Sequence, residues 1–159
     1  MEIVVNQIGV IHSPHKEIVG TPIQPKAANG IKGSVEVFPE FMDGLRDLEQ
    51  FSHIYLIYYF HLLKKSSLLV TPFMDSKQRG VFSTRAPGRP NHIGISIVNL
   101  LRIEKNILYI SDVDIVDSTP LLDIKPYVPD FDIRKVEKIG WLDDNVDKLS
   151  GSKDDGRFS

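Results

Sequence analysis

Apolar and polar positions alternate over several short segments of the chain, and this pattern predicts a mainly β fold. Residues 2–11 are rich in β-branched side chains, and residues 34–38 alternate the apolar Val35 and Val37 with the polar Ser34 and Glu36. Short segments with a period of two are typical of half-buried strands. We therefore predict strands over 2–11 and 34–38, separated by an irregular surface loop over 15–32.

A second group of strands is predicted in the middle of the chain. Residues 53–63 are almost continuously apolar and aromatic, which favours a central strand covered on both faces. Residues 94–104 and 107–116 predict two further strands, joined by a tight hairpin at residues 105 and 106. A short last strand is expected over 121–125.

Only one segment has a clear helical period. Residues 39–51 begin with a proline and repeat large apolar side chains every three or four positions, which predicts a short amphipathic helix. These side chains are Phe41, Leu45, Leu48 and Phe51. Five or six strands with one or two short helices predict a mainly β (α+β) domain, built as a small closed or strongly curved β-barrel.

The length and composition favour a single domain. A chain of 159 residues is long enough to bury one core. We expect one β-barrel domain over 1–142, followed by an acidic, partly disordered tail over 143–159. The absence of cysteine excludes disulfides, thiolate metal sites and a cysteine nucleophile.

Charge is unevenly distributed along a chain whose formal net charge is only -2. Residues 76–103 contain five basic residues and no acidic one, whereas 12 of the 21 acidic residues follow position 111. The prolines and glycines of residues 79–94 predict a rigid basic loop. Within it, Arg85 and Arg89 can present planar guanidinium groups to phosphate or carboxylate. The alternative is a solvated loop whose arginines pair with the acidic region.

Three carboxylates lie within ten residues of each other. Asp114, Asp117 and Asp123 can bind ribose hydroxyls or an amine, or accept a proton during a reaction. The alternative is that they only cap turns, as aspartate often does.

Several common functions are not supported by motifs. The chain has no glycine-rich dinucleotide-binding motif, no Walker sequence and no nucleophile elbow. Its five histidines show no metal spacing beyond a weak pair at His12 and His15, so no metal is expected. The N-terminus lacks the pattern of a signal peptide, and the longest apolar run is far shorter than the ~20 residues that cross a bilayer. We expect a cytoplasmic protein with no membrane segment.

Five blocks of this sequence resemble, in the same order, the blocks of the TsaA-like family, whose characterised members are the TrmO-type tRNA methyltransferases. The resemblance covers residues 3 to about 130. The blocks are IGVIHSPHKE at 8–17, the PIQP of 22–25, FSHIYLIYYFH at 51–61, GVFSTRAPGRPNHIGIS at 80–96 and VDIVDSTPLLDIKPYVP at 113–129.

The resemblance implies a compact β-barrel, usually dimeric, that uses S-adenosylmethionine to methylate N6 of threonylcarbamoyladenosine next to the anticodon of tRNA. Its motifs carry two sets of residues onto this chain. The cofactor-binding set is Gln24, Pro25, Phe60, His61, Arg85, Ile97, Asp114, Ile115, Val116 and Asp117. The RNA-binding set is Arg89, Asn91, Lys125 and Tyr127. We therefore expect Arg85 to face the cofactor and Arg89 to face the RNA.

The acceptor nitrogen shares its lone pair with two π systems, so a positioned base is expected to assist the transfer. Our candidates are Asp114, Asp117 and Asp123, with His61 behind them. Two alternatives stay open: a non-catalytic barrel that binds S-adenosylmethionine or RNA, and a methyltransferase for a different acceptor.

The chain departs from the family pattern in three ways. His92 stands where the family more often has proline, and Ser118 stands where it more often has glycine. We expect the loop geometry to differ at these two positions. The additional C-terminal domain of longer bacterial relatives has no counterpart, so we expect the RNA phosphates to be held by the barrel or by a second subunit.

Overall fold

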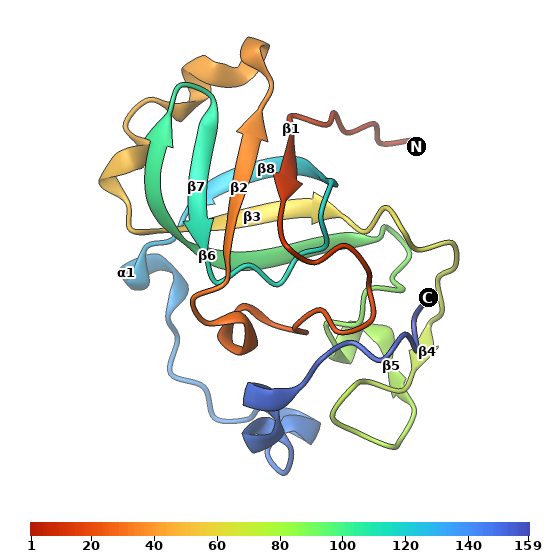
Figure 1. Ribbon diagram of the computed structural model, residues 1–159. Coiled ribbons are helices and arrows are strands. Elements are labelled where there is room, and N and C mark those ends of the chain that lie inside the picture. Colours follow the sequence, from red (N-terminus) through yellow and green to blue (C-terminus); the bar gives the residue numbers. More distant parts are fainter.

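Six antiparallel strands close into a barrel, shown in Figure 1, with the order β1-β2-β7-β6-β3-β8. The computed structural model describes the backbone of residues 1–159 and the side chains of residues 1–148 and 152–159. The barrel strands are β1 (Gly9–His12), β2 (Lys32–Val37), β3 (His53–Tyr59), β6 (Ile93–Glu104), β7 (Ile107–Ser111) and β8 (Thr119–Pro126). The predicted small closed β-barrel is confirmed.

Alternation along each strand fills the barrel interior. On β3, Ile54, Leu56 and Tyr58 are buried, while the residues between them are partly exposed. Because successive side chains of a strand point to opposite faces, one face of each strand builds the core and the other meets solvent. The prediction that β3 is covered on both faces is therefore wrong: the outward Tyr59 is 39% exposed.

The barrel closes through a short contact between distant parts of the chain. β1 pairs with β8, where Gly9 lies opposite Leu121, and with β2 on its other edge. The backbones of β1 and β2 lie especially close together at Gly33, where an added Cβ atom would lie 2.6 Å from the carbonyl oxygen of His12. Glycine at this position lets the backbones approach each other.

The other elements are short and lie outside the barrel. β4 (Leu69–Val70) and β5 (Arg79–Gly80) form a two-stranded sheet, and α1 (Pro129–Asp132) is a single turn. The remaining helices are 3₁₀ helices at Pro25–Ala28, Pro39–Leu45, Leu48–Gln50, Val81–Ser83, Gly140–Leu142 and Val146–Gly151.

The strand predicted over 53–63 ends at Tyr59, and two other predicted strands are also longer than the structure shows. The first begins at Gly9 rather than residue 2, because residues 2–7 lie outside any barrel ladder and Val4 is 81% exposed. The strand predicted over 107–116 ends at Ser111, since Asp112 takes a φ of +67° that turns the chain. Both boundaries depend on backbone geometry that an apolar pattern does not contain.

The amphipathic helix predicted over 39–51 is also wrong in detail. Two 3₁₀ helices replace it, and Asp47 separates them with a φ of +65°. The apolar period still identifies the inward side chains, because Leu45 and Leu48 are buried in the barrel core. Phe41, on the same predicted face, is 37% exposed.

The segment after β8 returns to the barrel. Figure 1 shows the C-terminus beside β4 and β5. Phe158 packs against a small cluster of Val70, Val81 and Ala86. The division into a domain over 1–142 and a partly disordered tail over 143–159 remains a prediction, and its part at 149–151 lies outside the described side chains. No helix within the described residues has the length and apolar character of a membrane span.

Candidate functional site

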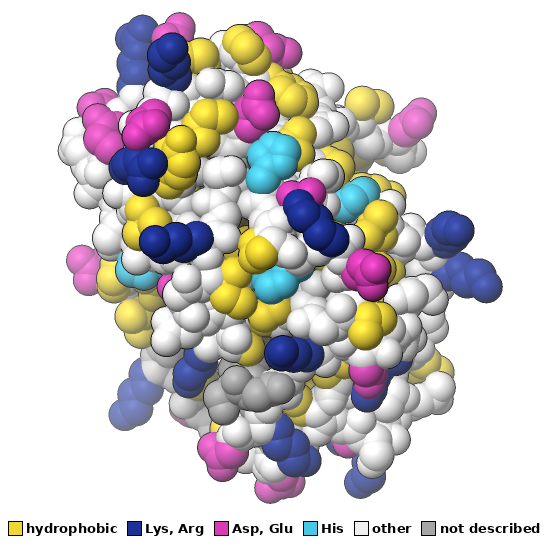
Figure 2. Space-filling view, in the orientation of Figure 1, with side chains coloured by type: hydrophobic (Ala, Val, Ile, Leu, Met, Phe, Trp, Pro, Cys, Tyr) yellow, Lys and Arg dark blue, Asp and Glu magenta, His cyan; other side chains and the backbone are white. Residues whose placement is uncertain are grey.

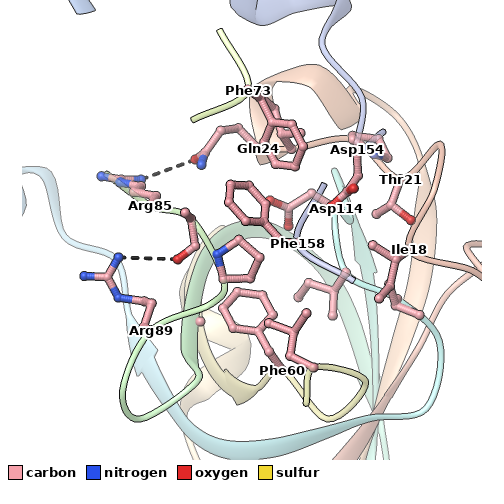
Figure 3. Close-up of a pocket in the computed structure, with 18 of the residues that line it drawn as sticks. Ile18, Thr21, Gln24, Phe60, Phe73, Arg85, Arg89, Asp114, Asp154 and Phe158 are labelled. Atoms are coloured by element: carbon pink, nitrogen blue, oxygen red, sulfur yellow. Dashed lines mark hydrogen bonds between the residues drawn. The ribbon is translucent and has the colours of Figure 1, made fainter. Parts of the chain in front are cut away.

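A pocket of about 320 Å³ lies at one end of the barrel (Figure 3). Its floor comes from the end of β3, the start of β6, and the connection between β7 and β8. These segments meet at the same barrel end because neighbouring strands are antiparallel. Its walls come from three loops, around residues 18–24, 72–74 and 84–89, together with Trp141, Asp154 and Phe158.

A short hydrogen-bond chain leads from the barrel interior to Asp114. Ser96 Oγ donates to Asp114 Oδ1 over 2.7 Å, and the hydroxyl of Tyr58 lies 3.0 Å from Ser96 Oγ. Since the hydrogen of Ser96 is used for Asp114, Tyr58 is the donor to Ser96. Burial raises the pKa of Asp114 to about 7, and the hydrogen bond from Ser96 opposes this rise. The pocket therefore holds a carboxyl group that titrates near neutral pH.

Gly94 provides the space that the Tyr58 ring needs to take part in this hydrogen-bond chain. A Cβ atom at position 94 would collide with the ring of Tyr58 and would lie 2.8 Å from Phe60 Cζ. Tyr58 and Phe60 pack edge to face, with ring centroids 5.3 Å apart. Glycine on β6 therefore lets two aromatic rings sit directly against the strand at the pocket floor.

One guanidinium group is available at the pocket edge. Arg85 is exposed, and its Nη1 donates to Gln24 Oε1 over 3.3 Å, as Figure 3 shows. His61 also lines the pocket, where burial lowers the pKa of its imidazole, so this ring is neutral at pH 7. The pocket thus combines a cation, a neutral imidazole and a titratable acid.

Arg89 lines the same pocket and holds its loop together. Its Nη1 donates to the carbonyl oxygens of Thr84 at 2.8 Å and Val81 at 3.2 Å, with Ala86 at 3.5 Å. The expected division, with Arg85 facing the cofactor and Arg89 facing the RNA, stays a prediction. Both arginines lie at the pocket, and Arg89 rigidifies the loop that carries Arg85.

Asp117 lies outside the pocket, and both of its carboxylate oxygens have hydrogen-bond or ion-pair partners. Its carboxylate accepts from the backbone N–H of Ser13 at 3.0 Å and from Ser118 Oγ at 3.1 Å, and it pairs with Lys16 Nζ at 2.8 Å. Burial alone raises the pKa of Asp117, but the hydrogen bonds from Lys16, Ser13 and Ser118 outweigh burial and lower it to about 2. This carboxylate joins the β7–β8 connection to the end of β1.

Asp123 belongs to a different part of the surface. Its Oδ2 pairs with Lys125 Nζ at 2.8 Å on β8, and its side chain lines a second hollow beside the 3₁₀ helix at Pro39–Leu45. Of the three carboxylates predicted from the sequence, the described structure brings only Asp114 into the main pocket.

The other predicted residues divide between the pocket and the surface. Gln24, Phe60, His61, Ile115 and Val116 line the pocket with Arg85 and Asp114, and Pro25, Ile97, Asn91, Lys125 and Tyr127 do not. Tyr127 packs edge to face with Tyr55, with ring centroids 5.7 Å apart. The binding roles of all these residues remain predictions.

Sequence reasoning did not assign several residues that build the site. Ser96 and Tyr58 carried a usable signal, because each is polar at an inward position of an alternating strand. Trp141, Asp154 and Phe158 carried none, because only the fold brings residues this late in the chain to the pocket.

The two departures from the family pattern coincide with unusual backbone geometry. His92 has a φ of +48° and donates its backbone N–H to the carbonyl oxygen of Arg89 at 3.1 Å. Proline can do neither, since its ring fixes φ near −65° and removes the N–H. Ser118 has a φ of +63°, a conformation that glycine adopts without strain. How the loop geometry at His92 and Ser118 compares with that of the family stays a prediction.

The surface does not show one basic patch on the face drawn in Figure 2. Lys and Arg side chains are spread over this face and are mixed with acidic ones. Among the described side chains, no group of three or more His, Asp or Glu is arranged to hold a metal ion.

The fold and the site together define a small β-barrel protein with a ligand pocket at one barrel end. A model of the tRNA-methyltransferase O N-terminal domain matches residues 10–133. The chain therefore belongs to this family, as the resemblance implied.

Relatives and solved structures agree with this assignment. A protein of Pyrococcus abyssi named as a probable S-adenosyl-L-methionine-binding protein is 62% identical over 151 residues, which cover 95% of this chain and 82% of that protein. A mouse protein named tRNA (adenine(37)-N6)-methyltransferase is 36% identical over 132 residues, which cover 79% of this chain and 31% of that protein. A crystal structure of TrmO from Pseudomonas aeruginosa is 38% identical with a TM-score of 0.74, covering 89% of this chain and 63% of that chain. The chain thus spans less than two thirds of this solved structure.

Proposed function

We propose that this protein is an S-adenosylmethionine-dependent methyltransferase that acts on N6 of threonylcarbamoyladenosine next to the anticodon of tRNA. The observation that carries the proposal is a pocket that combines an exposed Arg85 with an Asp114 whose pKa is about 7, in a chain of the tRNA-methyltransferase O family.

The pocket residues fit the proposed cofactor. Arg85 can hold the carboxylate of its methionine end, and Gln24 positions the guanidinium group. Phe60, Ile115 and Val116 provide apolar walls suited to an adenine ring. A neutral His61 adds no charge that would repel a sulfonium ion. When bound, S-adenosylmethionine supplies an electrophilic methyl group on a positively charged sulfur.

Asp114 is the general base in this proposal. Its carboxyl group lies in the pocket, whereas Asp117 and Asp123 lie outside it with cationic partners. A base works best when its pKa is close to the working pH, and a positioned base contributes roughly 10² to 10⁴-fold. Ionised Asp114 takes the N6 proton of the acceptor, and Ser96 holds the carboxylate in place.

Positioning supplies most of the remaining acceleration. An in-line displacement needs donor and acceptor atoms held about 3 to 3.5 Å apart in alignment. The loop that Arg89 braces, together with the glycine-supported floor at Gly94, gives the pocket fixed walls. These fixed walls set the direction in which donor and acceptor approach each other.

The direct test uses tRNA with and without threonylcarbamoyladenosine. Incubation with cofactor carrying a labelled methyl group should label only the modified tRNA, and Asp114→Asn should slow single-turnover transfer by roughly 10² to 10⁴-fold. Asp123→Asn serves as the matched control and should keep the rate within about twofold, because Asp123 does not line the pocket and its carboxylate pairs with Lys125. Transfer at the wild-type rate by Asp114→Asn contradicts the assignment of the base.

The same experiment separates the alternatives. A non-catalytic barrel would bind the cofactor and label no RNA. A methyltransferase for another acceptor would leave threonylcarbamoyladenosine-containing tRNA unlabelled while slowly consuming cofactor in the presence of its own substrate. The titrating Asp114 favours an enzyme over a passive binding barrel.

RNA contacts are proposed for Arg89, Asn91, Lys125 and Tyr127, as the family motifs imply. Asn91 is exposed beside the pocket loop, and Lys125 is 60% exposed on β8. Substituting these residues should weaken tRNA binding and reduce its salt dependence, while cofactor binding without RNA is unchanged for Asn91 and Lys125.

We also propose that the protein is a homodimer that works on cytoplasmic tRNA. An apolar outer face on the paired strands β3 and β6 supports this assembly. It includes Tyr59, Ile93 and Ile95, which are 39%, 42% and 49% exposed, and the two isoleucines continue this face into the pocket. Sedimentation equilibrium at micromolar concentration should show a dimer, and Ile95→Glu should shift it to monomer. A wild-type monomer at that concentration contradicts this part of the proposal.

A further inference from the structure

The pocket has a wall that lies outside the family's matched region. The family model ends at residue 133, yet Trp141, Asp154 and Phe158 line the pocket. Figure 3 shows Asp154 near Thr21 and Ile18, on the side of the pocket opposite Arg85. We propose that residues 152–159, here called the C-terminal strap, form a cofactor-binding wall in which Asp154 binds the α-ammonium group of S-adenosylmethionine. This inference rests on the proposed use of that cofactor.

Backbone contacts fix the strap against the loop before β2. The N–H of Gly20 donates to the carbonyl oxygen of Asp154 at 2.7 Å, and the N–H of Asp154 donates to the carbonyl oxygen of Thr21 at 2.8 Å. Pro22 and Lys153 form an antiparallel bridge one residue further along. Because both backbone groups of Asp154 are bonded, its side chain has a defined origin at the pocket wall.

Aromatic packing anchors the other end of the strap. Phe158 meets Phe73 edge to face, with ring centroids 5.0 Å apart. Arg157 donates to the carbonyl oxygen of Pro72 at 2.9 Å, and its guanidinium lies 5.2 Å from the centre of the Phe73 ring. Phe73 and Phe158 both line the pocket, so the strap supplies apolar wall as well as charge.

Asp154 is suited to bind a cation that donates hydrogen bonds. Its Oδ1 accepts from the N–H of Gly156 at 2.7 Å, whereas Oδ2 has no hydrogen-bond donor among the side chains and backbone described. No lysine or arginine in the described structure forms an ion pair with it, although Asp155 beside it pairs with Arg157. Burial raises the pKa of Asp154. A bound ammonium group would supply the missing donor and the missing charge.

The two cations of S-adenosylmethionine differ in what they need. An ammonium group carries three N–H donors, whereas a sulfonium ion carries none. Arg85 is available for the neighbouring carboxylate on the opposite wall. The amino acid end then lies between a cation and an anion, and Asp114 stays free for the acceptor proton. Placing Asp154 on the ammonium group therefore gives each charged side chain a single partner.

The test measures ligand binding without RNA, by calorimetry, for the wild-type protein and for Asp154→Asn. Asparagine keeps the Oδ1 acceptor for Gly156, so the turn is preserved. We expect affinity for S-adenosylhomocysteine, which has the ammonium group and no sulfonium charge, to fall about 10-fold. Affinity for methylthioadenosine, which lacks the amino acid end, should change less than about twofold. Asp144→Asn, an exposed aspartate outside both the strap and the pocket, is the matched control and should change neither.

Each outcome decides the inference. Selective loss of S-adenosylhomocysteine affinity supports it. Equal loss of both ligands means that the change only distorts the wall, and unchanged binding means that Asp154 does not touch the cofactor; either result overturns it. Because no tRNA is present, a wild-type protein that binds both ligands but labels no tRNA removes the proposed activity and leaves this inference standing. A wild-type protein that methylates tRNA, with Asp154→Asn binding normally, removes the inference alone.

Discussion

Replacing Asp114 with asparagine should make the barrel more stable at alkaline pH while it removes the proposed base. The pKa of Asp114 is raised from its ordinary 3.8 to about 7 by burial. A raised carboxyl pKa means that the folded state binds the proton more tightly than the unfolded state. Its contribution to stability is therefore fully present below about pH 4 and is lost as the pH rises through about 7.

The size of the effect follows from this shift. A difference of about three pKa units corresponds to roughly 4 kcal/mol of unfolding free energy at about pH 8. The pocket is open to solvent and Ser96 still donates to the carboxylate, so we expect about 2 kcal/mol. Asparagine keeps an acceptor for Ser96 and has no charge to desolvate. Asp114→Asn should thus be equal to wild type near pH 4 and about 2 kcal/mol more stable near pH 8.

Asp117 provides a control with the opposite sign. Its pKa is lowered to about 2, so its contribution to stability is present above pH 3.8 and is lost only as the pH falls through about 2. Asp117→Asn should destabilise the protein by about 1 to 2 kcal/mol, almost equally at about pH 4 and about pH 8. Lys16, its partner, is 69% exposed, which keeps the expected value below the full shift.

Urea denaturation followed by fluorescence of Trp141 measures both variants over this pH range. A stability difference between Asp114→Asn and wild type that is the same at every pH would contradict the raised pKa of Asp114. A stabilising effect of Asp117→Asn would contradict the lowered pKa of Asp117. A gain in stability together with a loss of transfer would identify Asp114 as a group kept for chemistry rather than for folding.

Three other substitutions test neighbouring parts of the site. Arg85→Ala should weaken cofactor binding about 10-fold in calorimetry without RNA, because it removes the exposed guanidinium group; equal affinity would remove its assigned role. Arg89→Met should lower the free energy of unfolding by about 1 to 2 kcal/mol in urea denaturation, since three carbonyl oxygens lose their donor. An unchanged free energy would mean that the loop does not depend on these hydrogen bonds. Ser118→Gly should raise stability by about 0.5 to 1 kcal/mol, because the φ of +63° strains serine; a loss would contradict this.

The barrel strands were predictable because each one shows its own alternation of apolar and polar residues. Alternation places Val35 and Val37 on one face of β2, and the same rule places Leu108 and Ile110 on β7. The boundaries were less predictable, since they depend on single residues such as Asp112 that enter the left-handed backbone region. An apolar pattern also does not show which β-prone residues find a partner strand, so residues 2–7 were assigned too much structure.

The site was predictable only in part, for a similar reason. Motif resemblance placed Arg85, His61 and Asp114 together, and the structure puts all three at the pocket. It gave no means to separate Asp114 from Asp117, which stand three positions apart. Burial beside Ser96 and pairing with Lys16 give these two carboxyl groups opposite pKa shifts. Such a difference comes from tertiary contacts alone.

The pairing of β1 with β8 also determines when the barrel can close during synthesis. One edge of β1 pairs with the nearby β2, but its other edge waits for Leu121, more than a hundred residues later in the sequence. Closing such a long loop is slow, and folding dominated by distant strand pairs takes about milliseconds to seconds. A growing chain on the ribosome therefore exposes unpaired strands until β8 has emerged, and the pocket is complete only after Phe158 follows. Unpaired strand edges make the incomplete chain prone to aggregation during synthesis, and this risk falls once β8 and the C-terminal strap have folded onto the barrel.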